Sequence, residues 1–282
     1  MKVGQKIRWR LELLNKALHS WSEVDWIGVF KEILSSHSKA KSYPQPRLLD
    51  REGDLGLYQV GTRSFFFPLA FDPSFLGLVY DEIFVRHVYE HGECRVRPGD
   101  WVVDAGACEG FFSLYALEKG ANVLAFEPVP ELVRALERTL AEFIKAGRAR
   151  IFPFALGQAK GEKTLHIYYY NVGRSTLSSE AQNVRGKKSD VVRKEKVLVT
   201  SLDSLLAEGL LPPISFIKAD VKGFERDLLL GAQEVIRRYR PRLSICTYHC
   251  PDDWQVIPRL VRKLGGYKIK FKDGFFEHLC AW

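Results

Sequence analysis

A strand, a glycine turn and a helix follow one another at residues 101–114, and this segment constrains the fold of the chain more than any other. The apolar run 101–105 predicts a strand that ends at Gly106, and Gly110 opens an apolar-faced helix. Glycine lets the backbone turn sharply and approach a ligand without a β-carbon in the way. Such a turn after a first strand is typical of nucleotide sites at the carboxyl edge of a parallel sheet.

The rest of the chain from residue 101 repeats this alternation. Short apolar runs rich in β-branched residues alternate with helical periods, which predicts a mostly parallel sheet with helices on both faces. We expect strands at 101–105, 123–126, 151–155, 214–219 and 243–248, and helices at 111–119, 130–146, 224–238 and 253–264. The last residues, 267–272 and 276–282, predict a terminal antiparallel hairpin, because Asp273-Gly274 between them suits a tight turn.

Two segments lie outside this alternation. Residues 1–78 begin with an amphipathic helical period and contain the apolar run 65–68, and we expect them to form a small cap or lid. The remaining residues, 79–282, are expected to form the ligand-binding domain. An insertion at 163–200 separates two of its strands, and insertions of this kind often carry substrate-reading loops.

The glycine turn predicts a cationic nucleoside rather than a dinucleotide. The pattern that begins at Asp104 has Cys108 where a dinucleotide fingerprint has its second glycine, and Glu109 follows, which opposes a pyrophosphate. S-adenosylmethionine carries a sulfonium and an α-amino group, which Asp104 would approach. Glu127 ends the next strand, 23 residues beyond Asp104, where a carboxylate can accept both ribose hydroxyls. Ala155 and Leu156, at the end of the expected third strand, would hold the adenine.

These expectations define a cofactor site for S-adenosylmethionine. Its members are Asp104, Ala105, Gly106, Gly110, Glu127, Pro128, Ala155 and Leu156.

Five blocks of the chain resemble the FkbM-type methyltransferases over about residues 80–271. The blocks, in chain order, are 97–107 (RPGDWVVDAGA), 126–128 (FEP), 155–157 (ALG), 201–205 (SLDSL) and 216–225 (FIKADVKGFE). The chain departs from the family pattern at Lys222, where members usually have an acidic residue, and at 108–110, where they usually have Asn-x-Gly.

This resemblance implies a Rossmann-like class I methyltransferase fold. The expected architecture is a mostly parallel seven-stranded sheet with a C-terminal antiparallel hairpin and a small N-terminal helical cap. It also implies O-methylation of a hydroxyl on a sugar, glycan or other small-molecule acceptor, with S-adenosylmethionine as the methyl donor.

The acceptor must lose a proton, and two residues at strand ends are candidates for the base. Asp220 closes the expected fourth strand and His249 follows the fifth, although either could also have a structural role as a helix cap or a packed side chain. Asp220 and Glu225 could bind a divalent cation, but no third ligand has a clear spacing, so no metal is expected. Tyr80, Phe84 and Tyr89 could close over the site as a lid, although aromatic residues at this spacing more often pack in a core. Arg174, Ser175 and Thr176 could contact the acceptor.

The formal charge of +8 favours an anionic partner only where the charge is clustered. Residues 183–196 hold six basic and two acidic side chains, a net charge of +4, and we expect them to form a basic loop. One alternative is therefore an RNA or protein methyltransferase that holds its substrate with this loop. No Asn-Pro-Pro-Tyr motif occurs at 219–222, which argues against amino-nitrogen targets on bases. A second alternative is a catalytically inactive binding module on the same fold.

The sequence also bears on location. No run approaches the roughly 18 uncharged apolar residues of a membrane span, and charges interrupt the N-terminus where a signal peptide would be apolar. The five cysteines form no Cys-x-x-Cys pair, so reduced thiols are expected. We expect a soluble, cytoplasmic protein.

Overall fold

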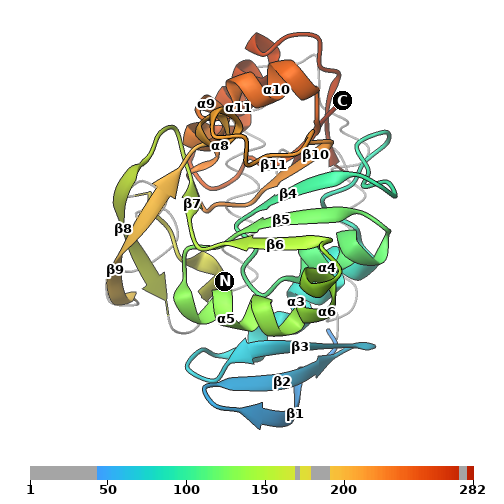
Figure 1. Cartoon of the computed structure of the whole chain (residues 1–282), viewed down its shortest axis with the longest axis vertical. Coiled ribbons are helices and arrows are strands. Elements are labelled where there is room, and N and C mark those ends of the chain that lie inside the picture. Colours follow the sequence, from blue (N-terminus) through green and yellow to red (C-terminus); the bar gives the residue numbers. More distant parts are fainter. Residues whose placement is uncertain (1–42, 169–171, 179–190, 273–277) are drawn as a thin grey trace. The chain divides into compact units, whose positions relative to one another are not determined.

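A computed structural model describes residues 43–168, 172–178, 191–272 and 278–282 (Figure 1). They belong to one compact unit, which comprises residues 42–272 and 276–282. The amphipathic start of the expected cap and the turn of the terminal hairpin lie outside the described residues. No helix in the described ranges is long and apolar enough to cross a membrane.

A seven-stranded sheet with the order β12-β13-β11-β10-β4-β5-β6 forms the centre of this unit. Six strands run in the same direction, and only β13 in this sheet is reversed, so that it pairs antiparallel with both β11 and β12. From the central strand β4 the chain continues to β5 and β6 on one side, and it later adds β10 on the other side of β4. The topological switch point, where ligands bind in such sheets, therefore lies between β4 and β10. The strands are β4 (Trp101–Ala105), β5 (Asn122–Phe126), β6 (Ala149–Phe152), β10 (Phe216–Ala219), β11 (Arg242–Cys246), β12 (Ile269–Phe271) and β13 (His278–Ala281).

Helices cover both faces of this sheet, as Figure 1 shows. Alternate residues of each strand point to opposite faces; Val102 packs in the cluster that contains Phe111 and Leu132, and Val103 packs in the one that contains Leu228 and Ile257. The first face is covered by α3 (Leu76–Tyr80), α4 (Phe111–Glu118), α5 (Pro130–Thr139) and α6 (Ala141–Lys145). The second is covered by α8 (Leu202–Ala207), α9 (Glu225–Leu230), α10 (Gln233–Tyr239) and α11 (Asp253–Lys263).

Two small sheets flank the central one. The first is antiparallel and packs its third strand on α5, where Thr139 Oγ1 accepts a hydrogen bond from the Phe66 backbone at 2.9 Å. The second has the order β7-β9-β8 and forms most of the insertion. Their strands are β1 (Arg47–Glu52), β2 (Leu55–Val60), β3 (Arg63–Pro68), β7 (Ala155–Leu156), β8 (Gly161–Tyr168) and β9 (Val191–Thr200). Short helical turns lie at η1 (Pro73–Phe75), η2 (Asp81–Val85) and η3 (Val172–Arg174).

The fold class is as the sequence predicted, with four local differences. The helix expected at 130–146 is interrupted at Leu140, and the one expected at 224–238 is interrupted at Gly231. A β-carbon on Gly231 would lie 2.1 Å from the Gly157 carbonyl oxygen, so this break lets two backbone segments touch. The strand expected at 151–155 ends at Phe152, and Ala155 belongs to β7 of another sheet.

The fourth difference concerns the expected cap. Its described part is largely an antiparallel sheet, because 65–68 alternate as a strand, with Phe65 and Phe67 buried. The division into a cap of 1–78 and a domain of 79–282 stays a prediction.

Candidate functional site

The turn between β4 and α4 is a strained loop that only glycine can build at its two ends. Gly106 and Gly110 have φ angles of +74° and +85°. A β-carbon on Gly106 would lie 2.3 Å from the carbonyl oxygen of Asp220, and one on Gly110 would lie 2.6 Å from Leu136. The β4–α4 turn therefore lies directly against the residue that follows β10. The sequence predicted cofactor residues in this turn and the candidate base Asp220 after β10, and both lie at the same edge of the sheet.

Asp104 faces the interior beneath this turn. Its carboxylate is fully buried and accepts hydrogen bonds from Ser113 Oγ at 2.7 Å and from Lys218 Nζ at 2.8 Å. Asp104 and Lys218 are paired in register on neighbouring strands, which brings their side chains together. Lys218 also donates to the Gly106 carbonyl at 2.8 Å. The ion pair therefore holds the glycine turn from below, and both Asp104 oxygens have partners within the chain.

Glu127 lies above the turn and joins it to β5. One carboxylate oxygen accepts the Cys108 N–H and the other accepts the Val129 N–H, both at 2.9 Å. Burial raises the pKa of Glu127 to about 7, although these bonds oppose the shift. Each carboxylate oxygen has a second acceptor position, so Glu127 fits a diol such as a ribose.

The other expected cofactor residues lie at the same strand ends or just beyond them. Ala105 is a buried end of β4, and Pro128 is half-buried next to Glu127. Leu156 is buried in the core with Leu202 and Leu205, whereas Ala155 packs with Val199 and Phe224.

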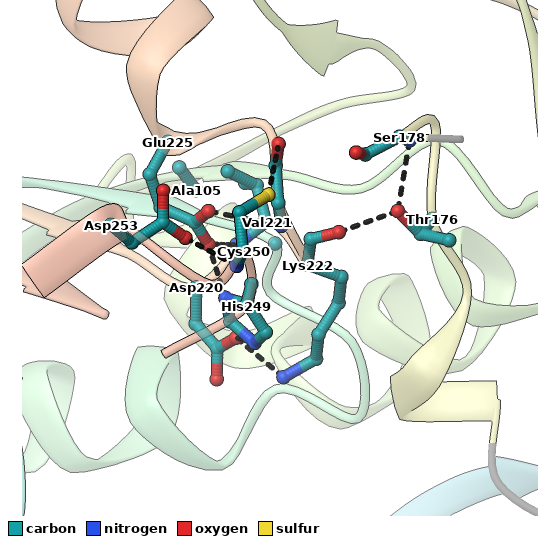
Figure 2. Close-up of polar contacts among 12 residues, drawn as sticks. Ala105, Thr176, Ser178, Asp220, Val221, Lys222, Glu225, His249, Cys250 and Asp253 are labelled. Carbon is teal, nitrogen blue, oxygen red and sulfur yellow. Dashed lines mark hydrogen bonds and ion pairs between the residues drawn. The ribbon is translucent and has the colours of Figure 1, made fainter. Parts of the chain in front are cut away.

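Asp220 is the centre of the second half of the site (Figure 2). It accepts a hydrogen bond from the Tyr89 hydroxyl at 2.8 Å, is paired with Lys222, and lies 3.4 Å from His249 Nε2. Burial opposes ionisation, but Lys222, His249 and Lys218 hold the pKa of Asp220 well below its usual value. Asp220 is therefore a stable carboxylate, 12% exposed at the side chain.

Behind Asp220, Glu225 holds His249 by a buried hydrogen bond. The distance between His249 Nδ1 and Glu225 Oε1 is 2.8 Å, and both side chains are buried. His249 Nε2 is buried and has no hydrogen-bond partner among the described residues. With Nδ1 directed at Glu225, Nε2 is directed at Asp220. The two residues that the sequence named as candidate bases are thus adjacent, from the ends of two neighbouring parallel strands.

The side chains of Asp220, Glu225 and His249 each bring a potential metal ligand atom within 4.8 Å of the others. However, Glu225 already accepts the N–H groups of Val221 at 2.8 Å and Gly223 at 2.9 Å, in addition to bonding His249. The Lys222 ammonium occupies the Asp220 oxygen that faces His249. The donor set is thus occupied by groups of the chain itself and does not fit a divalent cation.

Sequence reasoning gave four residues of this site no role in cofactor binding or base chemistry. Lys218 and Lys222 had no role at all, Glu225 was considered only as a metal ligand, and Tyr89 only as a lid or core residue. Lys218 had a signal in the sequence, because a lysine within the buried strand β10 needs a partner there. Lys222 has a φ of +53°, and Thr176 Oγ1 donates a hydrogen bond to its carbonyl. Tyr80 and Phe84, for which the sequence left a lid or a core position open, pack with Phe111 in the core.

The basic loop expected at 183–196 is in part a strand. Residues 183–190 lie outside the described residues, and 191–196 belong to β9. Arg193 pairs with Glu131 at 2.6 Å and with Glu195 at 2.9 Å, and Lys196 pairs with Glu162 at 2.9 Å. Two of the six positive charges are therefore already matched by acids.

Comparisons with known proteins agree with this geometry. A family model described as the methyltransferase FkbM domain matches residues 104–271. Methyltransferase sdnD of Sordaria araneosa is 32% identical over 179 residues, and 31-O-demethyl-FK506 methyltransferase FkbM of Streptomyces tacrolimicus is 28% identical over 179; each match covers 55% of this chain and 68% of the relative. AMB antimetabolite synthetase AmbE of Pseudomonas aeruginosa is 30% identical over 190 residues, which are 55% of this chain but 9% of that protein.

Among solved structures, methyltransferase FkbM from Methylobacillus flagellatus KT has a TM-score of 0.50 at 20% identity. The match covers 72% of this chain and 48% of that chain, so this chain spans about half of its length. This likeness supports the fold alone.

Proposed function

The chain belongs to the FkbM methyltransferase family, and we propose that it transfers a methyl group from S-adenosylmethionine to a hydroxyl of a sugar, glycan or other small-molecule acceptor. The observation that carries this proposal is the contact between the Gly106 turn and Asp220, because it brings the residues we assign to the nucleoside and those we assign to proton acceptance to one sheet edge.

The cofactor side is supported by the chemistry of the residues there. We assign the ribose to Glu127, whose carboxylate retains acceptor positions, and the methionyl part to the turn from Ala105 to Gly110. Asp104 contributes from beneath, by holding Lys218 and the turn. Pro128, Ala155 and Leu156 are assigned to the apolar surroundings of the adenine.

The acceptor side needs alignment and a proton acceptor. S-adenosylmethionine supplies a methyl group on a positively charged sulfur, so departure of the sulfur needs no acid and alignment provides most of the rate. Asp220 receives the hydrogen bond of the acceptor hydroxyl, since its carboxylate is the partly exposed member of the pair. His249 Nε2, which lies 3.4 Å from Asp220, is the second proton-accepting atom. A base of this kind contributes about 10² to 10⁴ in rate.

An RNA or protein acceptor has less support from the described residues. Two of the basic side chains on which that alternative depends are ion-paired on β9. The two kinds of acceptor also differ in salt dependence, because affinity for a polyanion falls steeply with salt whereas affinity for a neutral acceptor does not.

A screen with radiolabelled methyl donor tests the proposal. The protein is incubated with panels of sugars, glycans, hydroxylated small molecules and lipids, and with RNA and protein, at low and high salt. We expect label in a hydroxylated small molecule or glycan at both salt concentrations, and loss of that label in Asp220→Ala. Label only in RNA or protein, lost at high salt, would overturn the acceptor class.

A further inference from the structure

Besides Asp104 and Glu127, the glycine turn has a further buried acid, Glu109. The described residues provide no ion-pair partner for its carboxylate. Glu109 lies between Cys108 and Gly110 and is only 5% exposed. Its carboxylate is hydrogen-bonded by the Cys108 thiol and by its own backbone N–H, and within the described ranges it forms no ion pair. A buried carboxylate is normally paired or strongly hydrogen-bonded, so this one lacks its usual compensation.

The neighbouring charges do not supply a counter-ion either. Glu127 is close enough for each acid to disfavour ionisation of the other. The two lysines that face Glu109 are bound elsewhere, Lys218 to Asp104 and Lys222 to Asp220. Burial therefore raises the pKa of Glu109, and the lysines and the Cys108 thiol offset this only in part. Glu109 and Glu127 therefore border the turn, and neither forms an ion pair with another described residue.

We propose that Glu109 binds the cationic methionyl end of S-adenosylmethionine, which brings the positive charge that the turn lacks. This inference rests on the proposed function. Asp104 is less suited to the role, because both of its oxygens are bonded within the fold and none of its surface is exposed. Glu127 is assigned to the ribose through its remaining acceptor positions and lies just after β5. Gly106 and Gly110, on either side, let a ligand approach the carboxylate closely.

Calorimetric titration with three nucleosides tests this assignment on the full chain. S-adenosylmethionine carries the sulfonium and the ammonium, S-adenosylhomocysteine carries the ammonium alone, and methylthioadenosine carries neither. In Glu109→Gln, we expect the dissociation constant for S-adenosylmethionine to rise about tenfold or more, while that for methylthioadenosine changes less than about twofold. An equal loss for S-adenosylhomocysteine assigns the contact to the ammonium, and no loss assigns it to the sulfonium.

The control is Glu93→Gln, which removes an exposed acid away from the turn and should bind all three ligands as wild type does. The inference fails if wild type binds S-adenosylmethionine and Glu109→Gln binds it equally well. It also fails if Glu109→Gln loses methylthioadenosine to the same extent, because the loop would then be damaged. Wild type that binds none of the three would instead overturn the proposed cofactor itself.

Discussion

Four acids at the carboxyl edge of the sheet differ in what each carboxylate faces. Asp104 is bonded by a lysine and a serine, Glu127 by two backbone N–H groups, and Asp220 by Tyr89 and Lys222. Glu109 faces a thiol. From position along the chain we expected Asp104 at the cation, Glu127 at the ribose and Asp220 at the acceptor proton. The bonds of each carboxylate could not be predicted, because its partners come from other elements of the fold.

The pair Asp220 and His249 gives a prediction for catalysis. We expect His249→Asn to lower kcat about 10²-fold or more with the acceptor found by screening, because the second proton-accepting atom is lost. The dissociation constant of S-adenosylmethionine should stay within about twofold, since His249 bonds Glu225 and faces Asp220, neither of which is assigned to the cofactor. A variant with unchanged kcat would exclude His249 from proton transfer, and the neighbouring exposed residue Asp252 provides the control as Asp252→Asn.

The Gly106 turn gives a prediction for stability. Gly106→Ala should lower the free energy of unfolding by about 2–4 kcal/mol, because it adds the clash with the Asp220 carbonyl to the strain of a positive φ. The matched control is Gly99→Ala, at φ +82° with no atom within 4 Å of the added carbon, where about 1 kcal/mol is expected. Equal losses in denaturant titrations of the two variants would contradict the close contact.

At the scale of elements, the strands of the central sheet were predictable and the breaks in the helices were not. Apolar runs fixed β4, β5, β10 and β11 to within about two residues, since buried parallel strands read as continuous apolar segments. The interruption at Gly231 depends on the Gly157 backbone, which is distant in the sequence. The transfer of Ala155 to β7 depends on pairing with β9, so no local pattern could reveal it.

One buried ion pair, between Asp104 and Lys218, links β4 to β10. Lys218→Met should lower the free energy of unfolding by about 3–5 kcal/mol, because Asp104 would remain buried without its cation. Lys160→Met, which removes one partner of an exposed pair with Glu208, should change it by less than about 1 kcal/mol. Thermal or chemical unfolding measures both, and an equally mild effect of Lys218→Met would show that the pair does not hold the strands.

At the scale of the whole molecule, the raised pKa of Glu127 links folding to pH. The folded chain keeps a proton on Glu127 up to about pH 7, whereas an unfolded glutamate loses it near its ordinary pKa of 4.5. The folded state thus binds more protons in this window, so this group's contribution to stability is complete below about pH 4.5 and is lost as pH rises through about 7.

Glu127→Gln should therefore remove part of the pH dependence. We expect the fall in unfolding free energy between pH 5 and about 7.5 to be smaller in the variant than in wild type. Denaturant titrations across this range measure the slope. An unchanged slope in Glu127→Gln would mean that Glu127 titrates normally in the folded chain.

The proposed function requires that a nucleoside binds across the ends of β4 and β5. Calorimetric titration of wild type and Glu127→Ala with S-adenosylmethionine tests this directly. We predict saturable binding to wild type, an affinity about tenfold or more weaker in Glu127→Ala, and unchanged affinity in the control Glu137→Ala, which alters an exposed acid of α5. Binding to wild type and Glu127→Ala with equal affinity would contradict the assignment of the ribose to Glu127, and no binding to wild type would contradict the cofactor.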